Sequence, residues 1–173
     1  MADALSAARL LLAGVMPWLL ARGGPLALVA WCLAAASDWI DGRVARRTGT
    51  ASLRGAVLDN VADIAFVLGG LSTAAVLGLV PWLVPGSIAL SAGAYAAASR
   101  RAPPSAGGLA RSRLGHWGGV LNYVCLGVVA GKVAWPGAWW EAPLGLTALA
   151  TAAVNLAAVT LRLTARFQTA SRV

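Results

Sequence analysis

Four aspartates, Asp38, Asp41, Asp59 and Asp63, stand close together in a chain that has only six acidic residues. The first two are three residues apart and the last two are four apart. Because residues three or four apart share one face of an α-helix, each pair would present two carboxylates on one side of its helix. Residues 47–51 form a short connection between the two predicted helices, so antiparallel packing would bring the acidic faces together.

Such a cluster is costly in apolar surroundings. One aspartate at the centre of a membrane-spanning helix costs about 2.5–3.5 kcal/mol, and four at that depth would cost roughly 10 kcal/mol. Mutual repulsion adds to this, because neighbouring carboxylates resist joint ionisation. A divalent cation relieves both problems, and a site of carboxylate oxygens without His or Cys suits Mg²⁺, Mn²⁺ or Ca²⁺ rather than Zn²⁺. The pattern therefore predicts a site for hard divalent cations.

A simpler interpretation is a solvated turn at the membrane interface with ordinary ion pairs. The arginines that could serve as partners are Arg43, Arg46, Arg47 and Arg54. Ion pairs of this kind account for one or two of the acids. They do not account for four acids in register on two helices that also carry small residues, so we favour the metal site.

The rest of the sequence is typical of a membrane protein. The chain has 173 residues, of which 59% are hydrophobic and 12% charged, with a mean hydropathy of +0.74. Soluble domains are about 45–50% apolar. The net charge of +8 comes from short basic clusters between apolar runs rather than from one polar face, which argues against nucleic acid as a partner. Cys32 and Cys125 lie inside apolar runs and suggest neither a disulfide framework nor a zinc site.

Six apolar segments predict an all-α membrane bundle of six transmembrane helices in a single domain, residues 1–173. The segments are residues 5–21, 25–47, 52–80, 87–99, 114–134 and 144–163. Pro25 suits the first turn of a helix and Ser52 suits an N-cap. We expect the first segment to be retained rather than cleaved as a signal peptide, because Asp3 precedes it and no clear cleavage site follows.

The basic residues predict the orientation of these spans. With the N-terminus inside, twelve Lys and Arg residues fall on the inner side, and Arg22 and Lys132 fall on the outer side. This bias follows the positive-inside rule and predicts that both termini are cytoplasmic. The tryptophans expected in an outer aromatic belt are Trp82, Trp135, Trp139 and Trp140. The pairs Gly115/Gly119 and Gly127/Gly131 have the small-xxx-small spacing that allows close helix packing.

The aspartate segment resembles the signature of the CDP-alcohol phosphotransferase family. The sequence reads Asp38-x-x-Asp41-Gly42-x-x-Ala45-Arg46, then eight residues, then Gly55-x-x-x-Asp59-x-x-x-Asp63. It matches that signature at every fixed position, and the six-segment layout extends the resemblance over most of the chain. The resemblance implies an integral membrane enzyme of phospholipid synthesis.

The resemblance also assigns roles by position. It implies that Asp38, Asp41 and Asp59 are ligands of a two-metal centre for Mg²⁺, with Mn²⁺ as an alternative metal. Asp63 resembles the general base and also a metal ligand. The positions expected to lie near the nucleotide are Gly42, Ala45, Arg46 and Gly55, together with Ser6 and Arg9 of the first segment. For Ser6 and Arg9, a helix start with a cytoplasmic anchor is an equal alternative.

Members of the family transfer a phosphatidyl or similar group from a CDP-linked donor, such as CDP-diacylglycerol, to an alcohol and release CMP. The chemistry agrees with the residues, since paired metals neutralise a diphosphate and a carboxylate base activates an alcohol. The implied partners are the lipid donor, a small polar alcohol and the bilayer. The resemblance further implies a homodimer and a multi-pass protein of the cell (inner or plasma) membrane, with its active site on the cytoplasmic side.

The acceptor is expected near the start of the fifth segment, where Arg111, Arg113 and His116 could hold a phosphate. That suits glycerol 3-phosphate as the acceptor, with inositol phosphate or another polar alcohol as alternatives. Family members that make phosphatidylglycerophosphate often carry a Lys-rich stretch near this point, whereas this chain has His116 and Gly118 in place of basic residues. Nearby Asn122 and Tyr123, and Asn155 in the last segment, either face the cavity or support helix packing.

Two other functions are compatible with aspartates in membrane helices. Intramembrane prenyltransferases also use Asp-rich helices and Mg²⁺, but their two motifs lie far apart in longer chains. A small cation transporter would distribute its polar groups across the depth of the membrane, whereas this cluster lies at one end. The position of the acids therefore favours the transferase.

Overall fold

The computed structural model describes residues 2–48, 53–99 and 113–170, with side chains described for 9–37, 57–99 and 114–164 and for Gly55. These ranges contain helices and no strand, which confirms the all-α prediction for the described part of the chain. The helices are α1 (Ala2–Arg22), α2 (Leu26–Thr48), α3 (Leu53–Val76), α4 (Leu83–Ser99), α5 (Arg113–Ala134), the short 3-10 helix η2 (Ala138–Trp140) and α6 (Glu141–Ala170).

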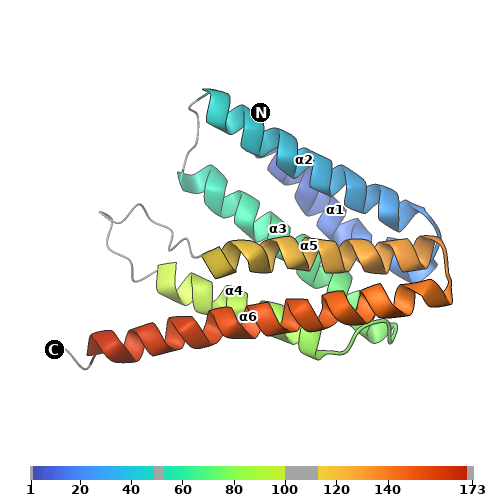
Figure 1. Ribbon diagram of the computed structural model, residues 1–173. Coiled ribbons are helices and arrows are strands. Elements are labelled where there is room, and N and C mark those ends of the chain that lie inside the picture. The colour runs from blue at the N-terminus through green and yellow to red at the C-terminus, as the bar shows by residue number, and fades with distance from the viewer. Residues whose placement is uncertain (1, 49–52, 100–112, 171–173) are drawn as a thin grey trace.

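The helices form a bundle in which α1 begins and α6 ends on the same side (Figure 1). α1 packs against α2 and α3, and α5 packs against α2, α3 and α6. α4 lies against α6 and α3. Because α1 and α5 each contact both α2 and α3, side chains on α1 and α5 are well placed to reach residues of the two helices that carry the aspartates.

Glycines end the helices that must reverse direction. The backbone angle φ is positive at Gly23 and Gly24, +76° and +84°, a conformation that glycine adopts without strain. α3 ends earlier than residue 80, the expected end, because Gly78 (φ +71°) closes it with a Schellman motif. The N–H of Gly78 donates to the carbonyl of Ala75, and the N–H of Leu79 donates to that of Ala74, the two bonds that define this cap.

A continuous apolar core runs through the bundle. Met16 and Leu20 of α1 meet Phe66 and Leu71 of α3, and Leu126 of α5 joins them. Many large apolar side chains also point outward, among them Trp82, Trp139 and Leu149, at 62%, 69% and 69% exposed. An outer surface of this kind is suited to lipid rather than to water.

Three helical segments of the described chain are long and apolar enough to cross a membrane. They are Val57–Val76, Leu114–Ala134 and Ala138–Thr164, while Leu26–Ser37 and Leu83–Ser99 are shorter apolar segments. The membrane class expected from composition is therefore supported by the helices themselves. The full six-span arrangement stays a prediction.

The two glycine pairs of α5 have different roles. A Cβ at Gly127 would lie 2.6 Å from ring atoms of Trp31, and one at Gly131 would lie 2.5 Å from the ring of Trp140. This pair therefore admits indole rings against the α5 backbone. A Cβ at Gly119 would meet nothing within 4 Å, and Gly115 and Gly119 both line cavities. We expected both pairs to allow close helix packing, and for Gly119 this expectation is wrong.

Replacing Gly127 with alanine should lower the thermal unfolding temperature of the purified protein. The new methyl group would collide with the rigid indole of Trp31, and overpacking of this kind costs about 1–3 kcal/mol. Gly93→Ala is the matched control, because Gly93 lies inside α4 and a Cβ there would meet nothing within 4 Å. Equal unfolding temperatures for Gly127→Ala and the wild type would contradict this packing.

Candidate active site

Arg9 is a buried cation in the N-terminal half of α1. Its side chain is 0% exposed, and its Nη1 lies 2.7 Å from Oδ1 of Asp63 and 3.8 Å from Oδ1 of Asp59. The two aspartates are one turn apart on α3, so their shared face meets α1. A guanidinium is too costly to bury without a counter-charge, and these carboxylates supply it. A contact between Arg9 and the nucleotide stays a prediction.

Tyr123 of α5 contacts the same carboxylate. Its hydroxyl donates to Oδ1 of Asp63 at 2.9 Å, and its ring stacks on Phe66 with the centroids 5.9 Å apart. The indole N–H of Trp31 donates to the backbone carbonyl of Tyr123 at 2.9 Å. Asp63 therefore receives donors from α1 and from α5, and it stands where three helices meet.

The described acids fit a hard divalent cation in their chemistry. Oxygens of Asp59 and Asp63 converge on one guanidinium nitrogen, so the space between them already favours positive charge, and all the donors are carboxylate oxygens. Among the side chains that the structure describes, no three His, Cys, Asp or Glu residues gather. Asp38 and Asp41 belong to α2, but their side chains lie outside the described ones, so the four-carboxylate site stays a prediction.

Several predicted site residues lie outside the described side chains. Gly55 is half-buried in the first turn of α3. The positions for which only the helical backbone is described are Ser6, Gly42, Ala45, Arg46 and Arg113. Arg111 lies outside the described residues altogether. His116 is exposed in the first turn of α5 and lines the two cavities described next.

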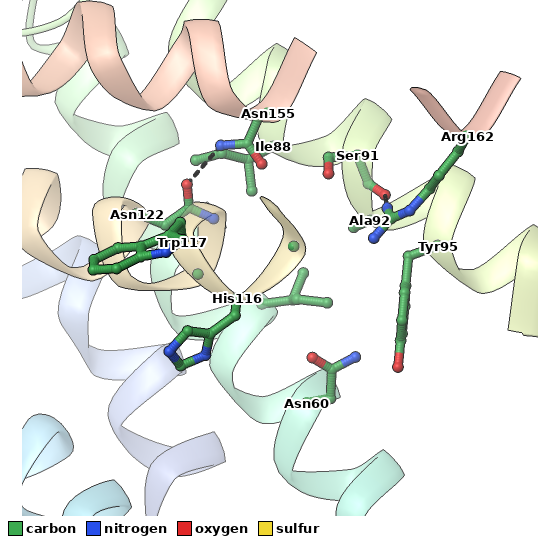
Figure 2. A pocket seen from close by; sticks show the side chains of 13 residues that line it. Asn60, Ile88, Ser91, Ala92, Tyr95, His116, Trp117, Asn122, Asn155 and Arg162 are labelled. Carbon is green, nitrogen blue, oxygen red and sulfur yellow. Dashed lines mark hydrogen bonds between the residues drawn. The ribbon is translucent and has the colours of Figure 1, made fainter. Parts of the chain in front are cut away.

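Two neighbouring cavities open beside the aspartates. The larger, about 680 Å³, is lined by α3, α4, α5 and α6 (Figure 2). The smaller, about 460 Å³, is lined by Asp63, Tyr123 and Trp31 among others. The residues that border both cavities are Asn60, Ile64, Gly115, His116, Gly119 and Asn122. The two cavities are therefore adjacent, and Asp63 lines the smaller of them.

The larger cavity gathers polar side chains that the sequence places far apart. The three asparagines of the chain, Asn60, Asn122 and Asn155, all line it. Nδ2 of Asn155 donates to Oδ1 of Asn122 at 2.7 Å and to the carbonyl of Thr151 at 2.9 Å, and Figure 2 shows the amides facing each other. Asn60 comes from α3, so three helices each contribute one amide to this cavity.

Arg162 is a candidate site residue that sequence reasoning missed. We expected it only as part of the basic inner flank of the last segment. Its Nη1 donates to the carbonyl of Ser91 at 3.1 Å, and its guanidinium lies 5.3 Å from the ring centroid of Tyr95, on the wall of the larger cavity (Figure 2). The helical period places Arg162 two turns from Asn155, on the same face of α6, and this shared face was the available signal.

Removing the charge of Arg9 should destabilise the protein in the absence of divalent cations. Arg9→Met leaves the carboxylates of α3 without their buried counter-charge, and losing one partner of a buried pair costs about 3–5 kcal/mol. Arg22→Met is the control, since Arg22 is exposed and stacks over Trp18 at 4.5 Å. Thermal unfolding of the purified variants measures both losses. A loss for Arg9→Met no larger than that for Arg22→Met would contradict the charge balance.

Comparison with known proteins identifies the family. No curated protein matches the chain. The family model for CDP-alcohol phosphatidyltransferases matches residues 1–163, which include α1 to α5 and most of α6. The match includes the aspartate segment, Arg9, Tyr123 and the residues of both cavities, so the chain belongs to the CDP-alcohol phosphatidyltransferase family.

Proposed function

We propose that this protein is a membrane enzyme that transfers a phosphatidyl or related phospholipid group from a CDP-linked donor, such as CDP-diacylglycerol, to a small polyol phosphate. Membership of the family supports transfer between a CDP-linked donor and an alcohol. The observation that carries the proposal is the position of Asp63. Its carboxylate borders the smaller cavity, beside a larger cavity that three amides and a guanidinium line and that can hold an acceptor.

In the proposed reaction, an acceptor hydroxyl attacks the phosphorus that bears the lipid. Asp63 accepts the hydroxyl proton, the new P–O bond forms and CMP leaves. An alcohol is a weak nucleophile, and a carboxylate within hydrogen-bond reach raises the rate of such a step by about 10²–10⁴-fold. Arg9 and Tyr123 both donate hydrogen bonds to Oδ1 of this carboxylate.

The proposed metal centre holds Mg²⁺, or Mn²⁺, between Asp38, Asp41, Asp59 and Asp63. When bound, the metals would neutralise the diphosphate of the donor. The small residues Gly42, Ala45 and Gly55 leave room for the nucleotide to approach the helix backbones. Ser6, Arg46 and Arg9 complete the proposed donor side of the site.

The larger cavity supports a polyol phosphate as the acceptor. A guanidinium has five N–H donors, so Arg162 can hold both the Ser91 carbonyl and an acceptor phosphate. The amides of Asn60, Asn122 and Asn155 suit hydroxyl groups, which both donate and accept hydrogen bonds. Glycerol 3-phosphate and inositol phosphate both have this combination of groups. We also propose that His116, with Arg111 and Arg113, helps to bind the acceptor phosphate.

The proposed setting is the cell membrane, crossed six times, with both termini and the active site on the cytoplasmic side. The start of α1 and the end of α6 on one side of the bundle support an even number of spans (Figure 1). The basic residues of the sequence predict which side that is. We further propose that two copies of the chain form a homodimer, as the family resemblance implies.

The reaction is tested by supplying purified protein with CDP-diacylglycerol and Mg²⁺, adding candidate acceptors one at a time and measuring CMP release. Release should occur with a polyol phosphate, and Asp63→Asn should lower turnover by about 10²–10⁴-fold because the proton acceptor is lost. Glu141→Gln is the control, since Glu141 at the start of α6 pairs with Lys132 in the last turn of α5, and neither residue lines either of the two cavities. Near wild-type turnover for Asp63→Asn would remove the base assignment, and no CMP with any acceptor would count against the transferase.

Arg162→Gln should raise the KM for a phosphorylated acceptor by about 10–100-fold, because a hydrogen bond to a charged group contributes about 1.5–3 kcal/mol. The kcat should change little, since Arg162 lies away from the reacting atoms. The unphosphorylated polyol serves as the internal control. It should be a poorer acceptor than the phosphorylated polyol, and its KM should be the same in the wild type and in Arg162→Gln. An unchanged KM for the phosphorylated acceptor would place its phosphate elsewhere.

A further inference from the structure

We propose that Tyr123 is a positioning residue for Asp63, and that Trp31 and Gly127 hold Tyr123 in place for this role. The proposal rests on the proposed role of Asp63 as the base. Tyr123 is not part of the aspartate signature, and it belongs to α5, whereas the other donor to Asp63, Arg9, belongs to α1. Its role follows from how its hydroxyl, ring and backbone are each held.

The hydroxyl of Tyr123 and the guanidinium of Arg9 meet the same oxygen of Asp63. The distances to Oδ1 are 2.9 Å for Tyr123 and 2.7 Å for Arg9. Two donors that reach one oxygen from different helices restrict rotation of the carboxylate more than one donor can. Arg9 also lies 3.8 Å from Asp59, so its charge is shared between two acids, whereas the phenol of Tyr123 is neutral. Tyr123 therefore contributes orientation without adding charge.

Tyr123 itself is fixed at two points. Its ring stacks on Phe66, with the ring planes 29° apart, and Phe66 is fully buried three residues after Asp63 on α3. The ring and the hydroxyl thus both meet α3, less than one turn apart. This double contact leaves the phenol little freedom to move away from the carboxylate.

The backbone of Tyr123 is held by Trp31 through a gap that Gly127 provides. Within a helix, the carbonyl of residue 123 faces residue 127, one turn further on. Trp31 donates its indole N–H to that carbonyl at 2.9 Å. A Cβ at Gly127 would lie 2.6 Å from the indole carbons and 3.1 Å from its nitrogen. The spacing Tyr123-x-x-x-Gly127 is therefore what lets α2 reach the α5 backbone directly behind the tyrosine.

The consequence for the reaction is preorganisation. A base acts only when it lies within hydrogen-bond reach of the acceptor hydroxyl, and Asp63, which lines the smaller cavity, is 28% exposed. When a catalytic group acts only in the transition state, a small displacement of that group lowers the reaction rate but does not weaken substrate binding. The effect of losing the tyrosine hydroxyl should therefore fall on kcat.

The test is Tyr123→Phe, which keeps the stacked ring and removes the hydroxyl. With the full-length protein, CDP-diacylglycerol and saturating Mg²⁺, kcat should fall about 10–100-fold, the equivalent of one hydrogen bond to a charged group. The KM values for donor and acceptor should stay within about twofold. Trp31→Phe should shift kcat in the same direction by a smaller factor. The control is Thr73→Val. This variant also removes a hydroxyl from the bundle, but that hydroxyl belongs to α3 and donates to the backbone carbonyl of Gly69.

A second readout does not depend on turnover. Tyr123→Phe should lower the thermal unfolding temperature of the wild type but leave that of an Asp63→Ala protein almost unchanged, because the bond is already absent there. A wild-type kcat in Tyr123→Phe, a change confined to KM, or additive losses of thermal stability would each overturn the proposal. If Tyr123→Phe is fully active while Asp63→Asn is inactive, only this inference fails. If Asp63→Asn is active, the proposed role of the base fails.

Discussion

The buried ion pair between Arg9 and Asp63 is the interaction on which the rest of the structure depends. A fully buried guanidinium inside an apolar bundle cannot be left without a counter-charge, and the carboxylates of α3 equally need a cation in these surroundings. The pair therefore fixes α1 against α3 in one register, with Asp59 beside it at 3.8 Å from the same nitrogen. The register in turn decides which face of α3 meets the cavities. Stability and chemistry thus depend on the same few atoms.

α5 connects this charged centre to the space where an acceptor can bind. Tyr123 reaches Asp63 from α5, and Gly119, one turn earlier, has open space where a side chain would stand. Gly127, one turn later, admits Trp31. Three residues spaced four apart on α5 therefore have three roles. Gly119 leaves the cavity open, Tyr123 orients the carboxylate, and Gly127 makes room for α2. The three asparagines and Arg162 then add polar groups to the wall of the larger cavity within an apolar bundle.

The sequence predicts much of the fold and part of the site, and the division has a physical reason. Local patterns predicted the helices, because apolar runs, Pro and Gly influence the backbone within one or two turns. The exception is α3, which the Schellman cap at Gly78 ends earlier than expected. The shared face of Asp59 and Asp63 was likewise local. The contact of Arg9 with Asp63 joins residues 54 positions apart, and the approach of Arg162 to the cavity depends on how α6 lies on α4. Such contacts follow from helix packing, which has no local signature in one sequence.

The coupling free energy between Arg9 and Asp63 tests the central claim most directly. Thermal unfolding of the wild type, Arg9→Met, Asp63→Leu and the double variant, in the absence of divalent cations, closes a double-mutant cycle. The buried pair predicts a coupling of about 2–3 kcal/mol, with the double variant more stable than the sum of the single losses allows. The exposed pair Lys132–Glu141 provides the comparison, with about 1 kcal/mol or less. Additive losses for Arg9 and Asp63 would contradict the account.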